Sequence, residues 1–132
     1  MSEIPDDLRY SEDHVWVRPD SGQSLAQIGI TDYAQDSLGD VVNITLPAVG
    51  HSLTPGQAFG EIESTKSISD LISPLDGTVH TRNDLLADTP ELVNANPYGQ
   101  GWMLQVEVAP STRDSQLGVL MDAHAYRSLV GE

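Results

Sequence analysis

The chain contains no cysteine and only one lysine among its 132 residues. The absence of cysteine excludes a disulfide, a thiolate metal ligand and a cysteine nucleophile supplied by the chain itself. Sulfur chemistry would therefore require a group brought in from outside. Five of the six basic side chains are arginines, so Lys66 carries the only side-chain primary amine.

Positive charge is also scarce, because 20 acidic residues face six basic ones and the net charge is -14 at pH 7. Nucleic acids and anionic membranes would be repelled, so we expect neither as a partner, and we expect protein partners to dock through basic surfaces. No apolar run approaches the ~20 residues of a membrane span. Residues 1–7 resemble neither a signal peptide nor a transit peptide. We expect a cytoplasmic monomer.

Aromatic residues make up only 5% of the chain, whereas Val, Ile, Leu, Gly and Pro are plentiful. This composition favours a mostly β fold of short strands and tight turns. The length fits one domain over residues 1–132, since about 150 residues per domain is usual. The pattern predicts strands over residues 8–18, 24–30, 41–46, 78–81 and 102–108, a turn over 19–22, a loop over 84–88, a helix over 29–39 and a helical turn over 89–93.

Helix-capping residues accompany the predicted helices. Thr31 can cap the start of the helix over 29–39, and Gly39 can end it in the left-handed region. A helical C-terminal tail is expected over residues 111–130. In that tail Ser111 with Asp114 is close to a capping box, and Asp122 can cap a second short helix.

A hairpin over residues 58–72 is predicted to present Lys66 at its tip. Two-residue alternation places Ala58, Gly60 and Ile62 on one face of its first strand. The tip lacks glycine, which favours a four-residue connection with a type I turn. Turns at 55–56 and 74–77 flank the hairpin almost symmetrically. Without that symmetry, a lone lysine would be interpreted as an ordinary solvated side chain.

No catalytic or metal-binding pattern is present. The four histidines, at positions 14, 51, 80 and 124, are too dispersed to predict a zinc site. Ser64-Thr65 rather than a glycine run precedes Lys66, which excludes a phosphate-binding loop. No serine lies in a strained strand-to-helix elbow pattern. The sequence therefore predicts a protein that is not itself an enzyme.

Several separated blocks resemble the H-protein family of the glycine cleavage system. The blocks are Leu8-Arg9-Tyr10, His14 with Trp16, residues 29–35, Leu38-Gly39-Asp40, Glu63-Ser64-Thr65-Lys66 with Ser69-Asp70, residues 90–94, Pro97-Tyr98-Gly99 and Gly101-Trp102. They cover nearly the whole chain, so the resemblance does not depend on one lysine in a hairpin.

This resemblance implies a lipoyl/biotinyl-type barrel-sandwich hybrid, with two small antiparallel sheets and a few short helices. It also implies that lipoic acid is attached covalently to Lys66 as N6-lipoyllysine, which would remove one positive charge and change the net charge from -14 to -15. Gly50, Glu63, Asp70 and Gly77 match the surroundings of the modified lysine in the family. We expect the two glycines to shape turns and the two acids to be recognised by a lipoate-attaching enzyme.

The family's members carry the aminomethyl group of glycine between enzymes. The implied partners are a pyridoxal-phosphate-dependent glycine decarboxylase (P protein), an aminomethyltransferase (T protein) and dihydrolipoyl dehydrogenase (L protein), which reoxidises the arm. Acidic side chains near the loaded arm could hold its cationic amine, and Asp70, Glu12 and Asp13 are the candidates. The family commonly has an acid between the histidine and tryptophan of the first strand, where this chain has Val15.

Other carrier roles share parts of this pattern. A lipoyl depot that donates its cofactor to 2-oxoacid dehydrogenase complexes would use Lys66 in the same way. A biotinyl carrier typically places its lysine between methionines, whereas Thr65 and Ser67 stand there in this chain. A lipoyl domain of an acyltransferase would be smaller and followed by a linker. An unmodified binding module is the remaining alternative.

Overall fold

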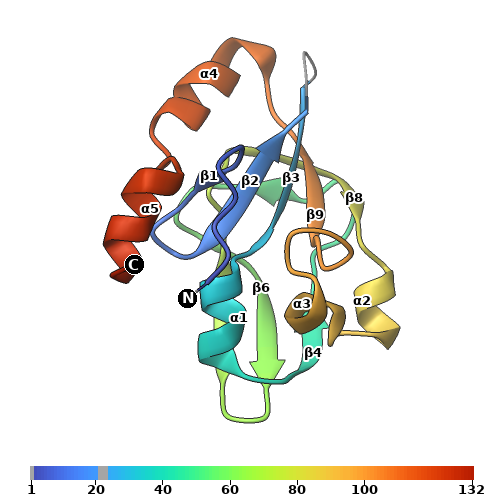
Figure 1. The fold of residues 1–132 in the computed structure, drawn as a ribbon. Helices are drawn as coiled ribbons and strands as arrows, with labels where there is room; N and C mark the ends of the chain where they lie inside the picture. Colours follow the sequence, from blue (N-terminus) through green and yellow to red (C-terminus); the bar gives the residue numbers. More distant parts are fainter. Residues whose placement is uncertain (1, 21–23) are drawn as a thin grey trace.

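The computed structural model describes residues 2–20 and 24–132, whose strands form two antiparallel sheets (Figure 1). The larger sheet has the order β1-β2-β3-β9-β8-β5, and the smaller has the order β4-β6-β7. The strands are β1 (Arg9–Tyr10), β2 (Val15–Pro19), β3 (Leu25–Ile30), β4 (Val41–Thr45), β5 (Ser52–Leu53), β6 (Ala58–Ser64), β7 (Ile68–Ile72), β8 (Gly77–Arg82) and β9 (Leu104–Glu107). The mostly β, two-sheet prediction is confirmed.

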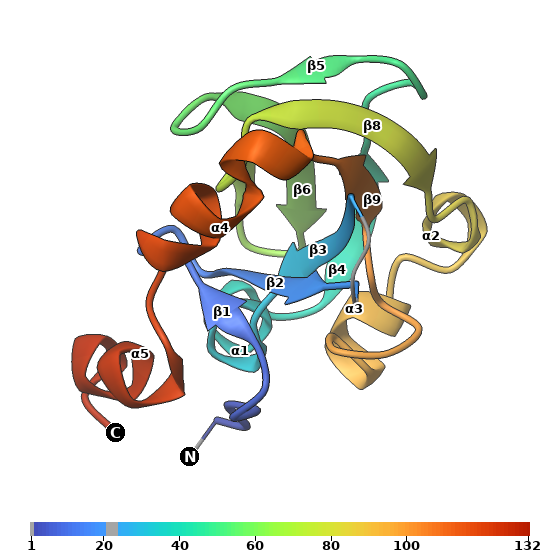
Figure 2. The same ribbon diagram turned by 90° about the horizontal axis from the view of Figure 1, so that it is seen from above.

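Among the described residues, five short helices flank the sheets. They are α1 (Asp32–Leu38), α2 (Leu85–Asp88), α3 (Leu92–Ala95), α4 (Pro110–Gly118) and α5 (Ala123–Val130). Viewed from above, α4 and α5 lie on one side of the strands, and α2 and α3 lie on the other (Figure 2). The main core joins both sheets: Val17, Ile28 and Val106 of the larger sheet share one buried cluster with Ile62 and Leu71 of the smaller. Burial of these aliphatic side chains is the main force that holds the sheets together.

A second buried cluster fixes the C-terminal tail to the first strand. It includes Leu8, Tyr10 and Trp16 together with Ala123 and Tyr126 of α5. The rings of Tyr10 and Tyr126 stack with centroids 4.6 Å apart. The helical tail predicted over 111–130 is confirmed, and Asp122 caps α5 by accepting a hydrogen bond from the backbone N–H of Ala125 at 2.9 Å.

The first predicted strand divides into β1 and β2 because the chain turns between them. Ser11 N–H donates to Val15 O at 2.9 Å, and His14 N–H donates to Ser11 O at 3.1 Å. His14 adopts a positive φ of 67°, which is uncommon outside glycine. The predicted turn over 19–22 falls partly outside the described residues.

The strand β6 does not alternate as predicted. A register shift between Ala58 and Gly60 reverses the phase, so that Ala58 is exposed while Phe59 and Ile62 are both buried. Gly60 is required at this bulge because a side chain there would collide with the carbonyl oxygen of Thr45 on β4.

Three predictions about short helices were wrong in detail. The predicted loop over 84–88 contains α2, which buries Leu86. The predicted turn over 89–93 becomes helical only at Leu92, and no side chain caps it. Ser111 does not cap α4, which begins at Pro110 after Ala109. Proline suits a first helical position because its φ is already fixed and its missing N–H would have no partner there.

Candidate functional site

The tip of the β6–β7 hairpin is closed by a serine. Ser64 N–H donates to Ser67 O at 2.8 Å, and Ser64 Oγ accepts from the N–H groups of Lys66 and Ser67 at 3.2 and 3.1 Å. The strands end at Ser64 and Ile68, so three residues connect them rather than the four predicted. A side-chain acceptor replaces the backbone acceptor of a longer turn, which explains the tight connection without glycine.

Lys66 is exposed at this tip, and its side chain lies against the end of α1. Its Nζ donates to the carbonyl oxygen of Ser37 at 3.2 Å. A cation at the C-terminal end of a helix is favoured by the helix dipole. Gly39 makes room for this contact, since an added Cβ would lie 3.1 Å from Lys66 Cε.

Both ends of α1 are fixed by hydrogen bonds. Thr31 caps the start as predicted by accepting from Ala34 N–H at 3.2 Å. Gly39 ends the helix with φ 82°, but its ψ of -159° lies outside the predicted left-handed helical region. Asn94 stabilises this end: its Nδ2 donates to Gln35 Oε1 and to Gly39 O, both at 2.9 Å. The position of the Lys66 contact is therefore set by a residue of α3.

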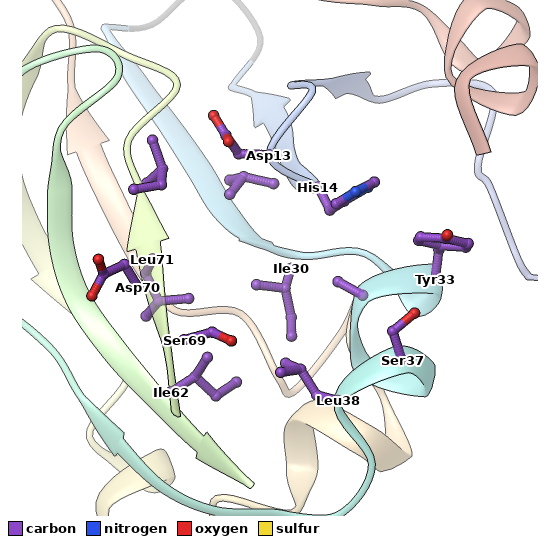
Figure 3. Close-up of a pocket in the computed structure, with 13 residues that line it drawn as sticks. Asp13, His14, Ile30, Tyr33, Ser37, Leu38, Ile62, Ser69, Asp70 and Leu71 are labelled. Carbon is purple, nitrogen blue, oxygen red and sulfur yellow. The ribbon is translucent and has the colours of Figure 1, made fainter. Parts of the chain in front are cut away.

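A cleft of about 310 Å³ lies between α1 and β7. Its floor is apolar, and its polar lining includes His14, Tyr33, Ser37 and Ser69 (Figure 3). Because Ser37 both lines the cleft and accepts the hydrogen bond from Lys66, the lysine side chain ends at the edge of this cleft.

The predicted acidic residues are distributed around the hairpin and the cleft. Asp13 and Asp70 both line the cleft and are exposed, and in Figure 3 the Asp70 carboxylate points away from the apolar floor. In the register of the hairpin, Asp70 of β7 lies opposite Glu61 of β6, and Glu63 lies opposite Ile68 near the tip. Glu12 lines a different depression. The structure therefore brings Asp13 and Asp70, but not Glu12, to the cleft.

The two predicted glycines shape the larger sheet rather than the hairpin itself. Gly50 precedes β5 with φ 92°, and its N–H donates to Val79 O at 2.8 Å. Gly77 begins β8, where a side chain would collide with the carbonyl oxygen of Glu107 on β9. A positive φ and a close backbone approach are the two situations in which only glycine fits well.

A buried hydrogen-bonded chain, not found by sequence reasoning, adjoins the cleft. The hydroxyl of Tyr126 lies 2.8 Å from His14 Nδ1 and 2.7 Å from Thr31 Oγ1. Thr31 Oγ1 also accepts from Ala34 N–H at 3.2 Å, so the Tyr126 hydroxyl links the cap of α1 to the ring of His14. No local pattern reveals the chain, because its members lie just before β2, at the cap of α1 and on α5.

Burial favours the uncharged forms of the side chains in and around this chain of hydrogen bonds. Burial lowers the pKa of His14, although the charge of Asp13 opposes the shift. Burial raises the pKa of Tyr126 to about 12 and raises the pKa values of Tyr10 and Tyr98 further. Near neutral pH, all four side chains are therefore uncharged.

In the described part of the chain, no three His, Asp or Glu side chains are grouped so that they could hold a metal ion. None of the helices there has both the length and the apolar character needed to cross a membrane.

Comparisons with known proteins agree on one family. The family model described as Glycine cleavage H-protein matches residues 8–132. The glycine cleavage system H protein of Mycobacterium avium is 51% identical over the full length of both chains, and that of Mycobacterium tuberculosis is 50% identical over the same extent. The crystal structure of a glycine cleavage system H protein from Mycobacterium marinum superposes with a TM-score of 0.87 at 35% identity, covering 98% of this chain and 100% of that one. The chain belongs to the glycine cleavage H-protein family.

Proposed function

We propose that this protein is the lipoyl-bearing carrier of a glycine cleavage system and that Lys66 is its attachment point. The observation that carries the proposal is the position of Lys66, the chain's only side-chain amine, exposed at the tip of a hairpin beside a cleft. An attached lipoyl group would supply a disulfide that can be opened and closed again, which the cysteine-free chain lacks. The protein would pass the aminomethyl group of glycine from the decarboxylase to the aminomethyltransferase and be reoxidised by dihydrolipoyl dehydrogenase.

The residues around Lys66 fit such a group. The tip backbone is fixed by Ser64, while Thr65 N–H donates to Asp40 O at 3.0 Å and joins the tip to the segment after α1. The Lys66 side chain would then carry the group from a fixed backbone. Acylation would remove its charge and weaken the contact with Ser37 O, which would release the arm from α1.

Recognition by a lipoate-attaching enzyme is proposed for the acids on the hairpin. Glu63 and Asp70 lie on either side of the tip, on β6 and β7. Gly50 and Gly77 would act indirectly, since both fix the larger sheet next to which the hairpin stands.

The cleft is proposed to receive the cargo end of the arm. A cargo amine is cationic near neutral pH, and Asp13 and Asp70 are the acids that line this cleft. Val15 lies in the apolar lining, so the charge that the family commonly provides at that position would come from Asp13 here. Glu12 would contribute only a longer-range attraction. The cytoplasmic location and the monomeric state stay predictions.

Intact-mass measurement tests the attachment. Protein produced with lipoate and a lipoate-attaching enzyme should gain the mass of one lipoyl group, and the Lys66→Arg variant should gain none. Asp76→Asn, at an exposed acid outside the hairpin, serves as a control that should still be modified. No gain in the wild type, or a gain that persists in Lys66→Arg, would contradict the proposal.

A further inference from the structure

Asn94, on α3, forms three hydrogen bonds through its side-chain amide. Its Oδ1 accepts from Val41 N–H at 2.9 Å. Its Nδ2 donates to Gly39 O and to Gln35 Oε1, both at 2.9 Å. A backbone N–H only donates and a backbone carbonyl only accepts, so these partners settle which end of the amide carries the oxygen. Both protons of the Asn94 amide are therefore used.

Two of these hydrogen bonds go to the residues directly before and after Asp40. The carbonyl oxygen of Asp40 accepts from Thr65 N–H at 3.0 Å, and Thr65 directly precedes Lys66. In Figure 1 this segment runs from the end of α1 past the hairpin tip to β4. A connection therefore runs from Asn94 on α3, through the backbone around Asp40, to the backbone next to the proposed attachment point.

The other hydrogen bonds at the tip act differently. Those accepted by Ser64 Oγ fix the shape of the turn itself. The bond from Lys66 Nζ to Ser37 O involves the amine that would react. Neither group of the bond between Thr65 and Asp40 reacts, so this bond can hold the turn against the segment after α1 while the amine is in use.

Attachment of lipoate by a ligase that uses ATP requires the amine to be well placed. The neutral Nζ of Lys66 would attack the carboxyl carbon of the lipoyl adenylate. The C–N bond forms, the bond from that carbon to the phosphate oxygen breaks, adenosine monophosphate leaves, and one Nζ proton passes to solvent. Reacting atoms have to come within about 3–3.5 Å, and a misplacement of about 1 Å can slow a reaction roughly 100-fold. A fixed hairpin tip places the amine reproducibly.

We propose that Asn94 is a positioning residue for lipoate attachment, because by holding the backbone on both sides of Asp40 it fixes the hairpin tip that presents Lys66 to the attaching enzyme. This inference rests on the proposed carrier function. Asn94 acts through Asp40 and Thr65 and touches no reacting atom. Its loss should therefore lower the kcat of attachment and leave KM almost unchanged.

The test uses the full-length, unmodified protein as substrate for a purified lipoate–protein ligase with lipoate and ATP, followed by intact-mass measurement over time. Asn94→Ala should lower kcat at least about fivefold and keep KM within about twofold of the wild-type value. Asn94→Asp has a similar size and can still accept from Val41 N–H, but its carboxylate cannot donate to Gly39 O. It should also lower kcat at least about fivefold.

The matched control is Asn96→Ala, which removes an exposed asparagine whose side chain forms no hydrogen bond with another described residue. Its kcat and KM should both stay within about twofold of the wild-type values. Acetylation of Lys66 by acetic anhydride needs no docked enzyme, so its rate in Asn94→Ala should also stay within about twofold of that in the wild type. A slower acetylation would show that the amine itself has become less accessible and would overturn the proposal.

Hydrogen exchange of two backbone amides at the tip distinguishes positioning from a general loosening. In Asn94→Ala, exchange at Thr65 N–H should become at least about fivefold faster, because its acceptor Asp40 is no longer held. Exchange at Ser67 N–H, which donates to Ser64 Oγ within the turn, should stay within about twofold of the wild-type rate. Equal acceleration at both amides would overturn the proposal.

The remaining outcomes separate this proposal from the carrier function. Failure of the wild-type protein to gain a lipoyl group would refute the carrier function. Normal lipoylation of the wild type with an unchanged kcat in both Asn94 variants would refute the positioning role alone. An equal fall in kcat for Asn96→Ala would also refute it, because that variant leaves all three hydrogen bonds of Asn94 in place.

Discussion

Replacing Tyr126 with phenylalanine removes one buried hydroxyl and leaves the ring in place. The hydroxyl joins His14 Nδ1 and Thr31 Oγ1 at 2.8 and 2.7 Å. The stacking with Tyr10, at 4.6 Å between ring centroids, is retained in the variant. The substitution therefore tests the hydrogen-bonded chain separately from the packing of α5.

The expected loss follows from burial. Thr31 is 0% exposed, so its hydroxyl would lose the hydrogen bond to Tyr126 with no water to replace it. An unsatisfied buried polar group costs about 1–3 kcal/mol. His14 is only half-buried, and its freed ring nitrogen can bond to water, so it adds little. We expect a loss of about 2 kcal/mol, which corresponds to a fall in Tm of roughly 8 °C for a chain of this size.

Urea unfolding followed by circular dichroism at pH 7.5 would measure this loss. The control is Tyr33→Phe, whose half-buried hydroxyl makes no hydrogen bond to another described residue, and which should change stability by less than about 0.5 kcal/mol. A double-mutant cycle with Thr31→Ala should give a coupling energy of at least about 0.5 kcal/mol. Equal stability of the Tyr126 and Tyr33 variants, or zero coupling, would show that the hydroxyl chain does not stabilise the fold.

Three further changes test other parts of the structure. Gly77→Ala should lower the free energy of unfolding by about 1–3 kcal/mol, measured with urea, because the new Cβ would collide with the backbone of Glu107. Gly118→Ala, where the added Cβ has open space, should cause no loss. Equal effects of the two substitutions would contradict the close approach at Gly77. The pKa of His14 is lower in the folded protein than its ordinary value of 6.5, so the contribution of neutral His14 to stability is present above pH 6.5 and is lost as pH falls through the lowered pKa. The free energy of unfolding of the wild type should therefore fall relative to that of His14→Asn between pH 7.5 and 5. Parallel plots of unfolding free energy against pH for the two proteins would refute this. Asp70→Asn should slow the rate of lipoylation, followed by intact-mass measurement over time, about tenfold, and Asp76→Asn should leave it unchanged. Equal rates for the two variants would exclude recognition of the Asp70 carboxylate.

Sequence reasoning identified the hairpin because its signals are local. Alternating residues and flanking turns fix where β6 and β7 run, and the only lysine falls between them. Local alternation fails at Ala58, because the bulge there depends on the close approach of Gly60 to β4. The helix α2 was not predicted for a similar reason. Its four residues are too few to show the spacing of apolar residues that indicates a helix, and burial of Leu86 decides their structure.

The cleft and the hydroxyl chain could not be predicted from local patterns. Their residues come from separate parts of the chain, around β2, α1, β7 and α5, and only the packing of these elements brings them together. Tyr126 and His14 are 112 positions apart, and the sequence around Tyr126 does not indicate which residue its hydroxyl contacts. Asp13 and Asp70 could be proposed separately as acids near the arm, but their shared cleft follows only from the structure.

The contact between Lys66 and α1 is strong enough to orient the unmodified lysine and too weak to keep its amine from reacting. A surface cation at a helix C-terminus contributes about 0.3–1 kcal/mol, so the amine leaves Ser37 O readily. The lipoate-attaching enzyme of the proposed function would therefore meet a lysine whose backbone is fixed by Ser64 and whose amine is available. Acylation removes the charge that favours this contact. In the proposed function, the amide bond that attaches the arm would also weaken its contact with α1, and the end of the arm would then be free to move between the cleft and another protein.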